Sequence, residues 1–316
     1  MKAFLHHRYG DPQSVMQLEE VDTPVPGDGQ VLVRVHAASV NAYDWHLLEA
    51  DPFLVRIGGM GFFRPRYPRV GADFAGVVEQ AGPGASDFQP GDRVFGSLSP
   101  TRNGAFAEYA LASVDYLTRM PSNASFAQAA AIPMAALTAL QGLRDTGGLT
   151  AGQRVAINGA SGGVGTYAVQ FARWLGGEVT AICSTGKMDL AHSLGAHHVI
   201  DYTKEDFTRA GTRYDLIFAV NGYQHLRDYR RALEPDGTYV MAGGTTKQIM
   251  QGFLRTPLMN RRTSQTLTSA AEKPNAADMR LVAGLHEDGT VRSVIDRTFP
   301  FEDAPGAVAY VREGHA

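Results

Sequence analysis

A glycine-dense turn between an apolar run and an amphipathic segment is the feature that most restricts how this chain can fold. Residues 154–165 read RVAINGASGGVG, and TYAVQFARWLGG follows without a break. The run 155–157 predicts a buried strand, and apolar residues recur at helical spacing through 164–175. This order is typical of a dinucleotide-binding βα unit, because the helix N-terminus offers free N–H groups to a pyrophosphate.

The glycines of the turn fall in a GxxGxxG pattern. Glycine tolerates positive φ, which lets the chain reverse sharply, and Gly165 would let the new helix pack tightly on the sheet. Glycine-rich turns also close ordinary hairpins, but a strand before and a helix after are the context that a dinucleotide site requires. We therefore predict that the cofactor is held by Gly159, Ala160, Ser161, Gly162, Gly163, Val164 and Gly165.

The next predicted strand, 179–182, bears on which nicotinamide cofactor binds. NAD sites tend to place Asp or Glu about 20 residues after the glycines, on the ribose 2′-hydroxyl. Here the strand ends in CSTGK (183–187), with no acid before Asp189. Hydroxyls and an ammonium group would hydrogen-bond and neutralise a 2′-phosphate. We therefore predict NADP(H), bound by Ser184, Thr185 and Lys187. The alternative for Lys187 is a solvated surface lysine.

Composition limits the class of protein. A chain of 316 residues favours two domains, and 44% hydrophobic with 19% charged residues is typical of a globular enzyme. The net charge of −3 gives no electrostatic case for a nucleic-acid or anionic-membrane partner. No apolar run approaches a membrane span, and no signal-peptide core is visible. The single cysteine, Cys183, excludes an intrachain disulfide. We expect a cytoplasmic protein.

The chain changes texture near residue 125. The first 120 residues are punctuated by turn signals and predict a β-rich region, with a long loop or flap over the site at 51–68. After it, predicted strands alternate with helices, which implies a parallel, doubly wound sheet. An Ala-rich helix is expected at 126–143, and the tail is expected to hold a strand at 291–299.

Motifs along nearly the whole chain carry a family resemblance. They include NAYDW (41–45), GADFAGVV (71–78), FQPGDRVFG (88–96), GAFAEY (104–109), AAIP (130–133), LTA (137–139), LGA (194–196) and VIDY (199–202). With the glycine turn, the chain resembles the medium-chain dehydrogenase/reductase superfamily, and within it the zinc-independent, ζ-crystallin-like quinone oxidoreductases.

The resemblance implies an α/β fold with two domains. A GroES-like β-barrel catalytic domain would take residues 1–125, completed by 265–316. A doubly wound Rossmann domain at 126–264 would bind NADPH, with the active site in the cleft. Family members are often homodimers, so a homodimer is expected here.

Departures from the superfamily pattern concern zinc. Its alcohol dehydrogenases place a cysteine ligand near the position of Ser39–Asn41, and a His-Glu pair where this chain has Ala72-Asp73. The four-cysteine structural lobe is also missing, since only a short loop runs from Gly96 to Gly104. A catalytic zinc needs about three protein ligands in tetrahedral geometry. We predict that the protein binds no metal.

Without zinc, the reaction depends on an acceptor that takes hydride readily. A quinone or an α,β-unsaturated carbonyl does so, and we predict hydride transfer from NADPH to such a substrate. Asn41 matches the family's cleft asparagine, and Tyr43 could donate to a developing oxyanion. The alternatives are that Asn41 stabilises its loop and that Tyr43 is a packed aromatic residue. Asp44 is expected to organise this loop rather than to transfer protons.

Further cofactor contacts follow from the resemblance. Thr138 matches the family's nicotinamide-facing threonine. Tyr202 follows the third strand, where the family contacts the 2′-phosphate region, although an ordinary exposed tyrosine is the alternative. Asn221, Gly243 and Gly244 end the strands that line the nicotinamide half. Two other functions stay open: a zinc-independent NADP-dependent alcohol dehydrogenase or carbonyl reductase, and a non-catalytic NADPH-binding protein.

Overall fold

The computed structural model describes the chain except for residues 54, 222–223, 244–263 and 315–316. The chain forms two compact units. Unit 1 comprises Met1–Met134 and Pro274–Ala316, and unit 2 comprises Ala135–Lys273. The sequence prediction placed the two boundaries earlier, after residues 125 and 264. The observed division after Met134 falls inside a helix, which no turn signal in the sequence marks.

Unit 2 is built on a six-stranded parallel sheet. Its strands, in spatial order, are β10 (His198–Asp201), β9 (Glu178–Cys183), β8 (Arg154–Asn158), β11 (Tyr214–Ala219), β12 (Leu233–Met241) and β13 (Thr266–Ser269). Counted along the chain, this is the order 3-2-1-4-5-6 of a doubly wound dinucleotide-binding sheet. The predicted α/β fold class is confirmed. The strand order reverses between β8 and β11, where such sheets bind their ligands.

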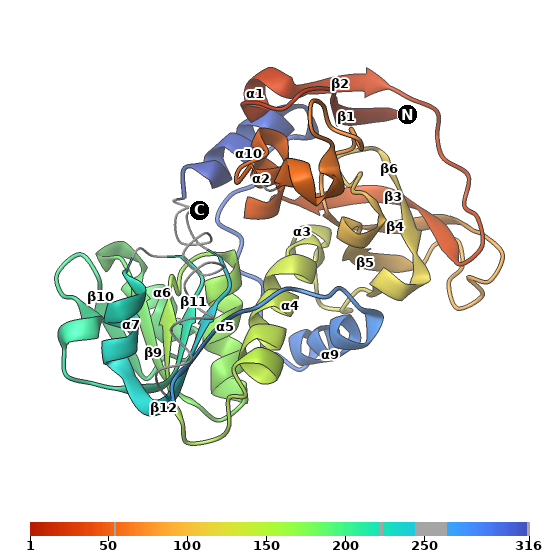
Figure 1. Ribbon diagram of the computed structural model, residues 1–316. Coiled ribbons are helices and arrows are strands. Elements are labelled where there is room, and N and C mark those ends of the chain that lie inside the picture. The colour runs from red at the N-terminus through yellow and green to blue at the C-terminus, as the bar shows by residue number, and fades with distance from the viewer. Residues whose placement is uncertain (54, 222–223, 244–263, 315–316) are drawn as a thin grey trace. The chain divides into compact units, whose positions relative to one another are not determined.

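Helices flank this sheet (Figure 1). The one that follows the glycine turn, α5 (Gly163–Trp174), buries Ala168, Phe171 and Ala172 and packs against β8 and β9. The other α-helices in the described residues of this part of the chain are α4 (Pro133–Gln141), α6 (Met188–Ser193) and α7 (Leu226–Ala232). Among the described residues, no helix combines the length and apolar composition that crossing a bilayer requires.

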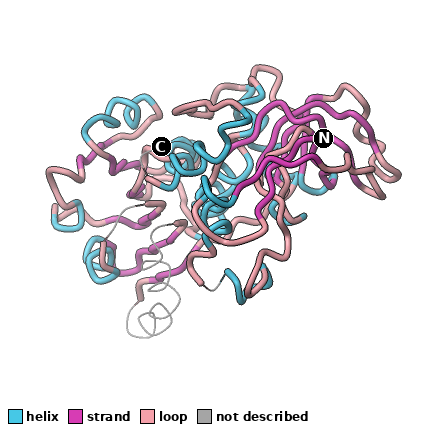
Figure 2. Tube along the Cα trace, turned by 90° about the horizontal axis from the view of Figure 1, so that it is seen from above, coloured by secondary structure: helices cyan, strands magenta, loops and turns pink. Residues whose placement is uncertain are grey.

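Unit 1 contains a five-stranded antiparallel sheet, whose strands lie side by side near the N-terminus in Figure 2. Its strands, in spatial order, are β6 (Tyr109–Ser113), β3 (Gln30–Ser39), β4 (Asp73–Ala81), β5 (Arg93–Ser97) and β7 (Leu117–Arg119). β1 (Lys2–His6) and β2 (Met16–Glu20) form a separate antiparallel pair, with single bridges from Ala3 to Ala107 and from Leu5 to Arg69. Alternate residues such as Val31 and Val33 are fully buried in the core.

Helices from both ends of the chain complete unit 1. They are α1 (Pro12–Val15), α2 (Ala42–Glu49), α3 (Phe126–Ala130), α9 (Ala276–Glu287) and α10 (Ala304–Arg312). Arg312 fastens the C-terminal helix, since its guanidinium lies 2.6 Å from Asp11 and 2.5 Å from Glu49. The Asn123 amide donates to the backbone carbonyl of His286 at 3.1 Å, which holds α9. The tail is therefore an integral part of this unit.

The single helix expected at 126–143 is wrong. The chain forms α3, leaves the helix near Ile132 and begins α4 at Pro133. Proline has no N–H to donate and disfavours the helical conformation of the residue before it, so it starts a new helix. The last two residues of the expected helix, 142 and 143, belong instead to a π-helical segment, Gly142–Thr146.

The strand expected at 291–299 is also wrong. In the described part of the chain, this segment pairs with no strand of either sheet. Val291 and Ser293 are buried as alternation predicts, but the Ser293 hydroxyl donates to the carbonyl of Gln128 at 2.7 Å. The apolar alternation ends there, because most of 294–299 is exposed. An extended segment with two buried side chains gave the same pattern as a strand.

Gly165 supplies a test of the packing between α5 and the turn before it. A Cβ at this position would lie 2.0 Å from the carbonyl oxygen of Gly159. The position of this Cβ is set by the backbone of residue 165, and the oxygen belongs to the backbone of Gly159, so no side-chain movement relieves the clash. We expect Gly165→Ala to lower the free energy of unfolding by about 2–3 kcal/mol, measured by thermal or urea unfolding.

Gly284 is the matched control, because it lies within α9 and a Cβ there would meet nothing within 4 Å. Gly284→Ala should stabilise the protein by about 0.5–1 kcal/mol, since alanine is the better helix former. Equal stability of Gly165→Ala and the wild type would contradict the close packing at the turn.

Candidate functional site

Gly159 makes the reversal that ends β8. Its φ is +88°, and a Cβ there would lie 2.6 Å from the carbonyl oxygen and 2.7 Å from the nitrogen of Asn221. Asn221 directly follows Val220, at the end of β11, and both N–H groups donate to the carbonyl of Asn158. The carboxyl ends of the two central strands therefore touch at the switch point of the sheet, and glycine is required there for conformation and for space.

The first turn of α5 supplies the donors of the predicted phosphate cradle. Gly162 is the N-cap and has no side chain to cap the helix, so the N–H groups of 163–165 lack intrahelical acceptors. They also sit at the positive end of the helix dipole. The N–H groups of Gly159 and Ala160, by contrast, point to the carbonyl of Ile182 at 3.2 and 3.1 Å. These two residues shape the cradle rather than donate to a ligand. A pyrophosphate fits this arrangement.

Other predicted cofactor residues lie near this edge. A Cβ on Gly243 would be 2.5 Å from the carbonyl oxygen of Val220, so the end of β12 adjoins that of β11. Ala135 of α4 lies 3.9 Å from a Cβ built on Gly163, which places this helix beside the start of α5. Thr138 is one turn further along α4 and is buried. The prediction for Gly244 lies outside the described residues.

The cluster predicted for the 2′-phosphate follows β9. Ser184 and Lys187 are half-buried at a 3₁₀ turn, Thr185–Lys187. Thr185 is engaged differently from the prediction, since its hydroxyl donates to Asp201 at 2.5 Å. A hydroxyl hydrogen given to this carboxylate is not available to a phosphate. Ser184 and Lys187 stay candidates.

Asp201 is the residue near this cluster that the sequence reasoning missed. The parallel register of β9 and β10 pairs it with Cys183, which carries the carboxylate to the turn. Hydrogen bonds from Thr185 and Thr203 hold the pKa of Asp201 well below its usual range. Lys204 also lies 3.2 Å from the carboxylate. The sequence did contain a signal, because Asp201 ends the third predicted strand. NAD sites carry a similar acidic residue at the end of the second strand.

Tyr202 follows Asp201, and its backbone N–H donates to the carbonyl of Cys183 at 3.1 Å. Its side chain is 61% exposed. The strand register thus brings this tyrosine next to the turn that follows β9, as the prediction requires, while leaving its ring accessible.

Asn41 lies in unit 1, at the start of α2. Its amide donates to Asp73 at 3.1 Å and to the Ser39 hydroxyl at 3.3 Å, and its backbone N–H donates to Asp44 at 2.8 Å. Three hydrogen bonds fix the loop, which is the structural alternative weighed for this residue. Both amide hydrogens are used, and Asn41 also forms a capping box with Asp44 at the start of α2.

Two fully buried carboxyl groups surround this asparagine. Burial raises the pKa of Asp73 to about 6, against hydrogen bonds from the N–H of Met134 and from Ser97. Burial, with the nearby charge of Asp73, raises the pKa of Asp44 to about 8, against the hydrogen bond from Asn41. No described Lys or Arg forms an ion pair with either group. Asp44 therefore keeps its proton at neutral pH and organises the loop, as predicted.

Tyr43 lies on the first turn of α2 and is half-buried. It directly precedes Asp44 in the chain. Its role as a donor to substrate stays a prediction.

This cluster does not fit a catalytic zinc ion. It offers carboxylates, an amide and hydroxyls but no thiolate or imidazole, and catalytic zinc sites take at least two of their three protein ligands from those groups. Histidines near this region are engaged elsewhere: His36 stacks on Phe126 at 4.3 Å, and His46 lies 2.5 Å from the carbonyl oxygen of Asp51. The described residues contain no group of three or more His, Cys, Asp or Glu able to hold a metal ion.

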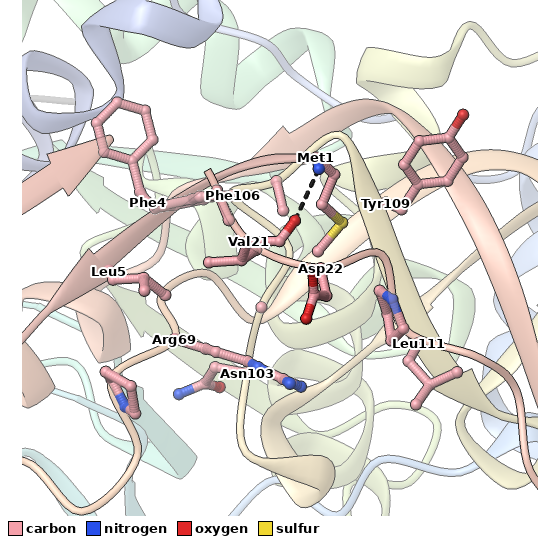
Figure 3. A pocket seen from close by; sticks show the side chains of 15 residues that line it. Met1, Phe4, Leu5, Val21, Asp22, Arg69, Asn103, Phe106, Tyr109 and Leu111 are labelled. Atoms are coloured by element: carbon pink, nitrogen blue, oxygen red, sulfur yellow. Dashed lines mark hydrogen bonds between the residues drawn. The ribbon is translucent and has the colours of Figure 1, made fainter. Parts of the chain in front are cut away.

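A cavity of about 240 Å³ also opens in unit 1, beside the N-terminal hairpin (Figure 3). Phe4, Leu5 and Phe106 form part of its wall, with Asn103 and Arg69 close together at one end. None of the described residues predicted for cofactor or substrate lines it. It is separate from the candidate site.

Comparison with known proteins agrees with this geometry. Residues 27–122 match the family model described as alcohol dehydrogenase GroES-like domain, and residues 194–316 match that of zinc-binding dehydrogenase. A chloroplast envelope quinone oxidoreductase homolog of Arabidopsis thaliana is 30% identical over 329 residues, covering 100% of this chain and 96% of that protein. The chain belongs to the quinone oxidoreductase branch of the medium-chain dehydrogenase/reductase superfamily. The predicted family and the GroES-like fold are confirmed.

Further relatives of this oxidoreductase point the same way. A 2-methylene-furan-3-one reductase of Solanum lycopersicum is 31% identical, covering 100% of this chain and 77% of that protein. The structure of the quinone oxidoreductase from Coxiella burnetii has a TM-score of 0.85 at 27% identity, with 100% and 96% of the two chains covered. The protein is an enzyme of the quinone oxidoreductase or enone reductase type and uses a nicotinamide cofactor.

The buried Asp44 gives this oxidoreductase a testable pH dependence. Folded Asp44 holds its proton up to about pH 8, whereas the unfolded carboxyl loses it near about pH 4. Between these values the unfolded state binds fewer protons, so the free energy of unfolding falls as pH rises. We expect Asp44→Asn to flatten this fall and to be more stable than wild type by about 1–3 kcal/mol at pH 8, measured by urea unfolding from pH 5 to pH 8.

Asp236→Asn is the control, because this carboxyl group is exposed. Its unfolding free energy should follow the wild-type pH dependence. A wild-type slope retained in Asp44→Asn would show that another group titrates.

Proposed function

We propose that this enzyme transfers hydride from NADPH to a quinone or an α,β-unsaturated carbonyl compound without zinc. The observation that carries the proposal is the uncapped start of α5 at the switch point of the sheet, together with Lys187, and no acidic residue, in the turn that directly follows β9. The names of the relatives support the substrate class, since they include quinone oxidoreductases, a furanone reductase and a trans-enoyl reductase of Aspergillus terreus.

The cofactor is held by residues of unit 2. The N–H groups of 163–165 bind the pyrophosphate, and Lys187 with Ser184 binds the 2′-phosphate. The nearby Asp201 does not repel this phosphate strongly, because two hydroxyl groups and Lys204 compensate its charge. When bound, the nicotinamide supplies the hydride. The protein supplies orientation and exclusion of water.

The substrate side is provided by α2 and the residues before it. Both amide hydrogens of Asn41 are taken by Asp73 and Ser39, so this side chain does not donate a hydrogen bond to a ligand. Tyr43 is then the donor to the substrate oxygen as negative charge develops there. The buried carboxyl of Asp44 fixes the backbone between them.

The proposed reaction needs no zinc ion, because the polar groups around Asn41 and Asp73 are unsuited to bind one. A quinone or an α,β-unsaturated carbonyl also accepts hydride without a Lewis acid. We further propose that the protein is a cytoplasmic homodimer.

Lys187 tests the choice of cofactor. We expect Lys187→Ala to raise the Kd for NADPH by about 10- to 100-fold, because a charge-assisted contact with the phosphate is lost. The Kd for NADH should change less than about twofold. Fluorescence titration of the reduced cofactors measures both constants.

Lys2→Ala is the control variant, because Lys2 lies on β1 of unit 1. It should leave both constants unchanged. An equal loss of NADPH and NADH binding in Lys187→Ala would contradict the assignment of Lys187 to the 2′-phosphate.

The reaction itself is tested by a panel of acceptors. Purified enzyme should oxidise NADPH with 1,4-benzoquinone or 9,10-phenanthrenequinone, followed by absorbance, and treatment with a metal chelator should leave kcat unchanged. A chelator-sensitive rate would contradict zinc independence. Strong NADP-dependent alcohol oxidation would favour an alcohol dehydrogenase, and NADPH binding without turnover would favour a non-catalytic protein.

A further inference from the structure

Exposed apolar side chains gather on one loop of unit 1. Nine large hydrophobic residues are exposed in the described part of the chain, and four of them fall between residues 53 and 63. Phe53, Ile57, Phe62 and Phe63 are exposed by 52%, 63%, 52% and 91%. Monomeric proteins rarely group such residues without an interaction to account for them. We call Phe53 and residues 55–69 the aromatic–arginine loop, because exposed Arg64, Arg66 and Arg69 follow the phenylalanines. It includes a π-helical segment, Arg56–Met60.

The rings of this loop pack on one another. Phe62 meets Phe53 edge to face at 5.6 Å and Phe63 at 4.9 Å between ring centroids. The guanidinium of Arg56 lies 5.5 Å from the Phe53 centroid and 4.6 Å from that of Tyr9. These contacts hold the aromatic side chains together as one apolar surface.

Backbone contacts fix the turn that presents this surface. The Tyr9 hydroxyl donates to the carbonyl oxygens of Met60 and Gly61, at 2.9 and 2.7 Å. The N–H of Arg66 donates to the Met60 carbonyl at 2.7 Å. Gly61 has φ of +107°, and a Cβ there would lie 2.1 Å from the carbonyl oxygen of Arg64. Phe62 and Phe63 thus stand at the tip of a constrained turn.

The loop is strongly basic although the whole chain is acidic. Residues 51–69 contain four Arg and a single acidic residue, Asp51, while the net charge of the chain is −3. Arg102, also exposed, stacks over the Tyr67 ring at 4.3 Å and extends the positive surface.

Nothing in the described part of unit 1 neutralises the exposed arginines. The arginine ion pairs found there involve Arg34, Arg119 and Arg312. Arg64 and Arg66 are therefore left to solvent or to a partner.

We propose that the aromatic–arginine loop binds the surface of a bilayer that contains anionic lipids. Phe62 and Phe63 would enter the boundary between headgroups and acyl chains, and Arg64 and Arg66 would bind lipid phosphates. A second copy of this chain is a poorer occupant, because a symmetric contact through the same loop would oppose arginine with arginine. This inference does not depend on the proposed reaction.

Sedimentation with vesicles tests the proposal. The full chain should pellet with phosphatidylcholine vesicles that contain about one third phosphatidylglycerol, and roughly tenfold less with phosphatidylcholine alone. Binding should weaken in about 1 M salt, where the screening length is about 3 Å. In addition, the emission of Phe63→Trp should shift to the blue only with the anionic vesicles, because the ring leaves water.

Two double variants separate the apolar and electrostatic contributions. Phe62→Ser with Phe63→Ser should lower the partition coefficient by at least about tenfold. Arg64→Gln with Arg66→Gln should lower it by about twentyfold, at about fivefold per arginine. Val25→Ser and Arg227→Gln remove an equally exposed apolar and cationic side chain elsewhere and should pellet like wild type. Unchanged thermal unfolding and NADPH binding confirm that each variant is folded.

Several results would overturn the proposal. Wild type that stays in the supernatant with anionic vesicles would contradict the proposal. Control variants that lose binding as strongly as the loop variants would also remove the loop as a membrane contact. A dimer dissociated by the phenylalanine variants, with vesicle binding intact, assigns the patch to a second copy. A raised KM for a water-soluble quinone with unchanged pelleting assigns it to the substrate.

Discussion

The cofactor half of this enzyme depends on backbone meeting backbone at one point of the parallel sheet. Gly159 stands against Asn221, and Gly165 stands against Gly159, at distances that admit no side chain. These contacts bring the ends of β8 and β11 together and set the first turn of α5 above them. The N–H groups proposed to bind phosphate are thus positioned by excluded volume rather than by side-chain contacts. Such an arrangement tolerates varied sequence around it but not at the glycines themselves.

The part of unit 1 proposed to bind substrate is held differently, because its polar groups are fixed by buried hydrogen bonds. Asp44 and Asp73 are removed from water without a cation, which is costly and raises both pKa values. Asn41, Ser39, Ser97 and the N–H of Met134 compensate part of that cost. A network of this kind has few alternative arrangements that satisfy its groups, so it holds Asn41 in one orientation. Burial of the two carboxyl groups lowers the free energy of unfolding, and the same network fixes the side-chain amide of Asn41.

The sequence predicted the elements whose signals are local. These are the βα unit, the parallel sheet implied by alternating strands and helices, the sharp reversal at Gly159 and the close packing at Gly165. Each depends on a few neighbouring residues, and each agrees with the structure. The break at Pro133 was also local, but the apolar periodicity on both sides concealed it. The segment after Val291 shows the opposite limit, because alternation reports burial and says nothing about a pairing partner. Asp201 was missed for a related reason: its place beside Thr185 is created by strand register, which no single segment encodes.

Net charge illustrates how an average conceals a local property. The value of −3 for the whole chain argued against an anionic partner, yet residues 51–69 carry four arginines and one aspartate, a local charge of +3, and the rest of the chain carries −6. Electrostatic attraction decays within about 8–10 Å at physiological ionic strength, so a surface responds to the charges near it and not to the total. Distant acidic residues therefore do little to repel an anionic surface from Arg64 and Arg66. The exposed phenylalanines beside them add a contribution that salt does not screen. The relevant quantity for recognition is the charge of a patch together with the apolar area it surrounds.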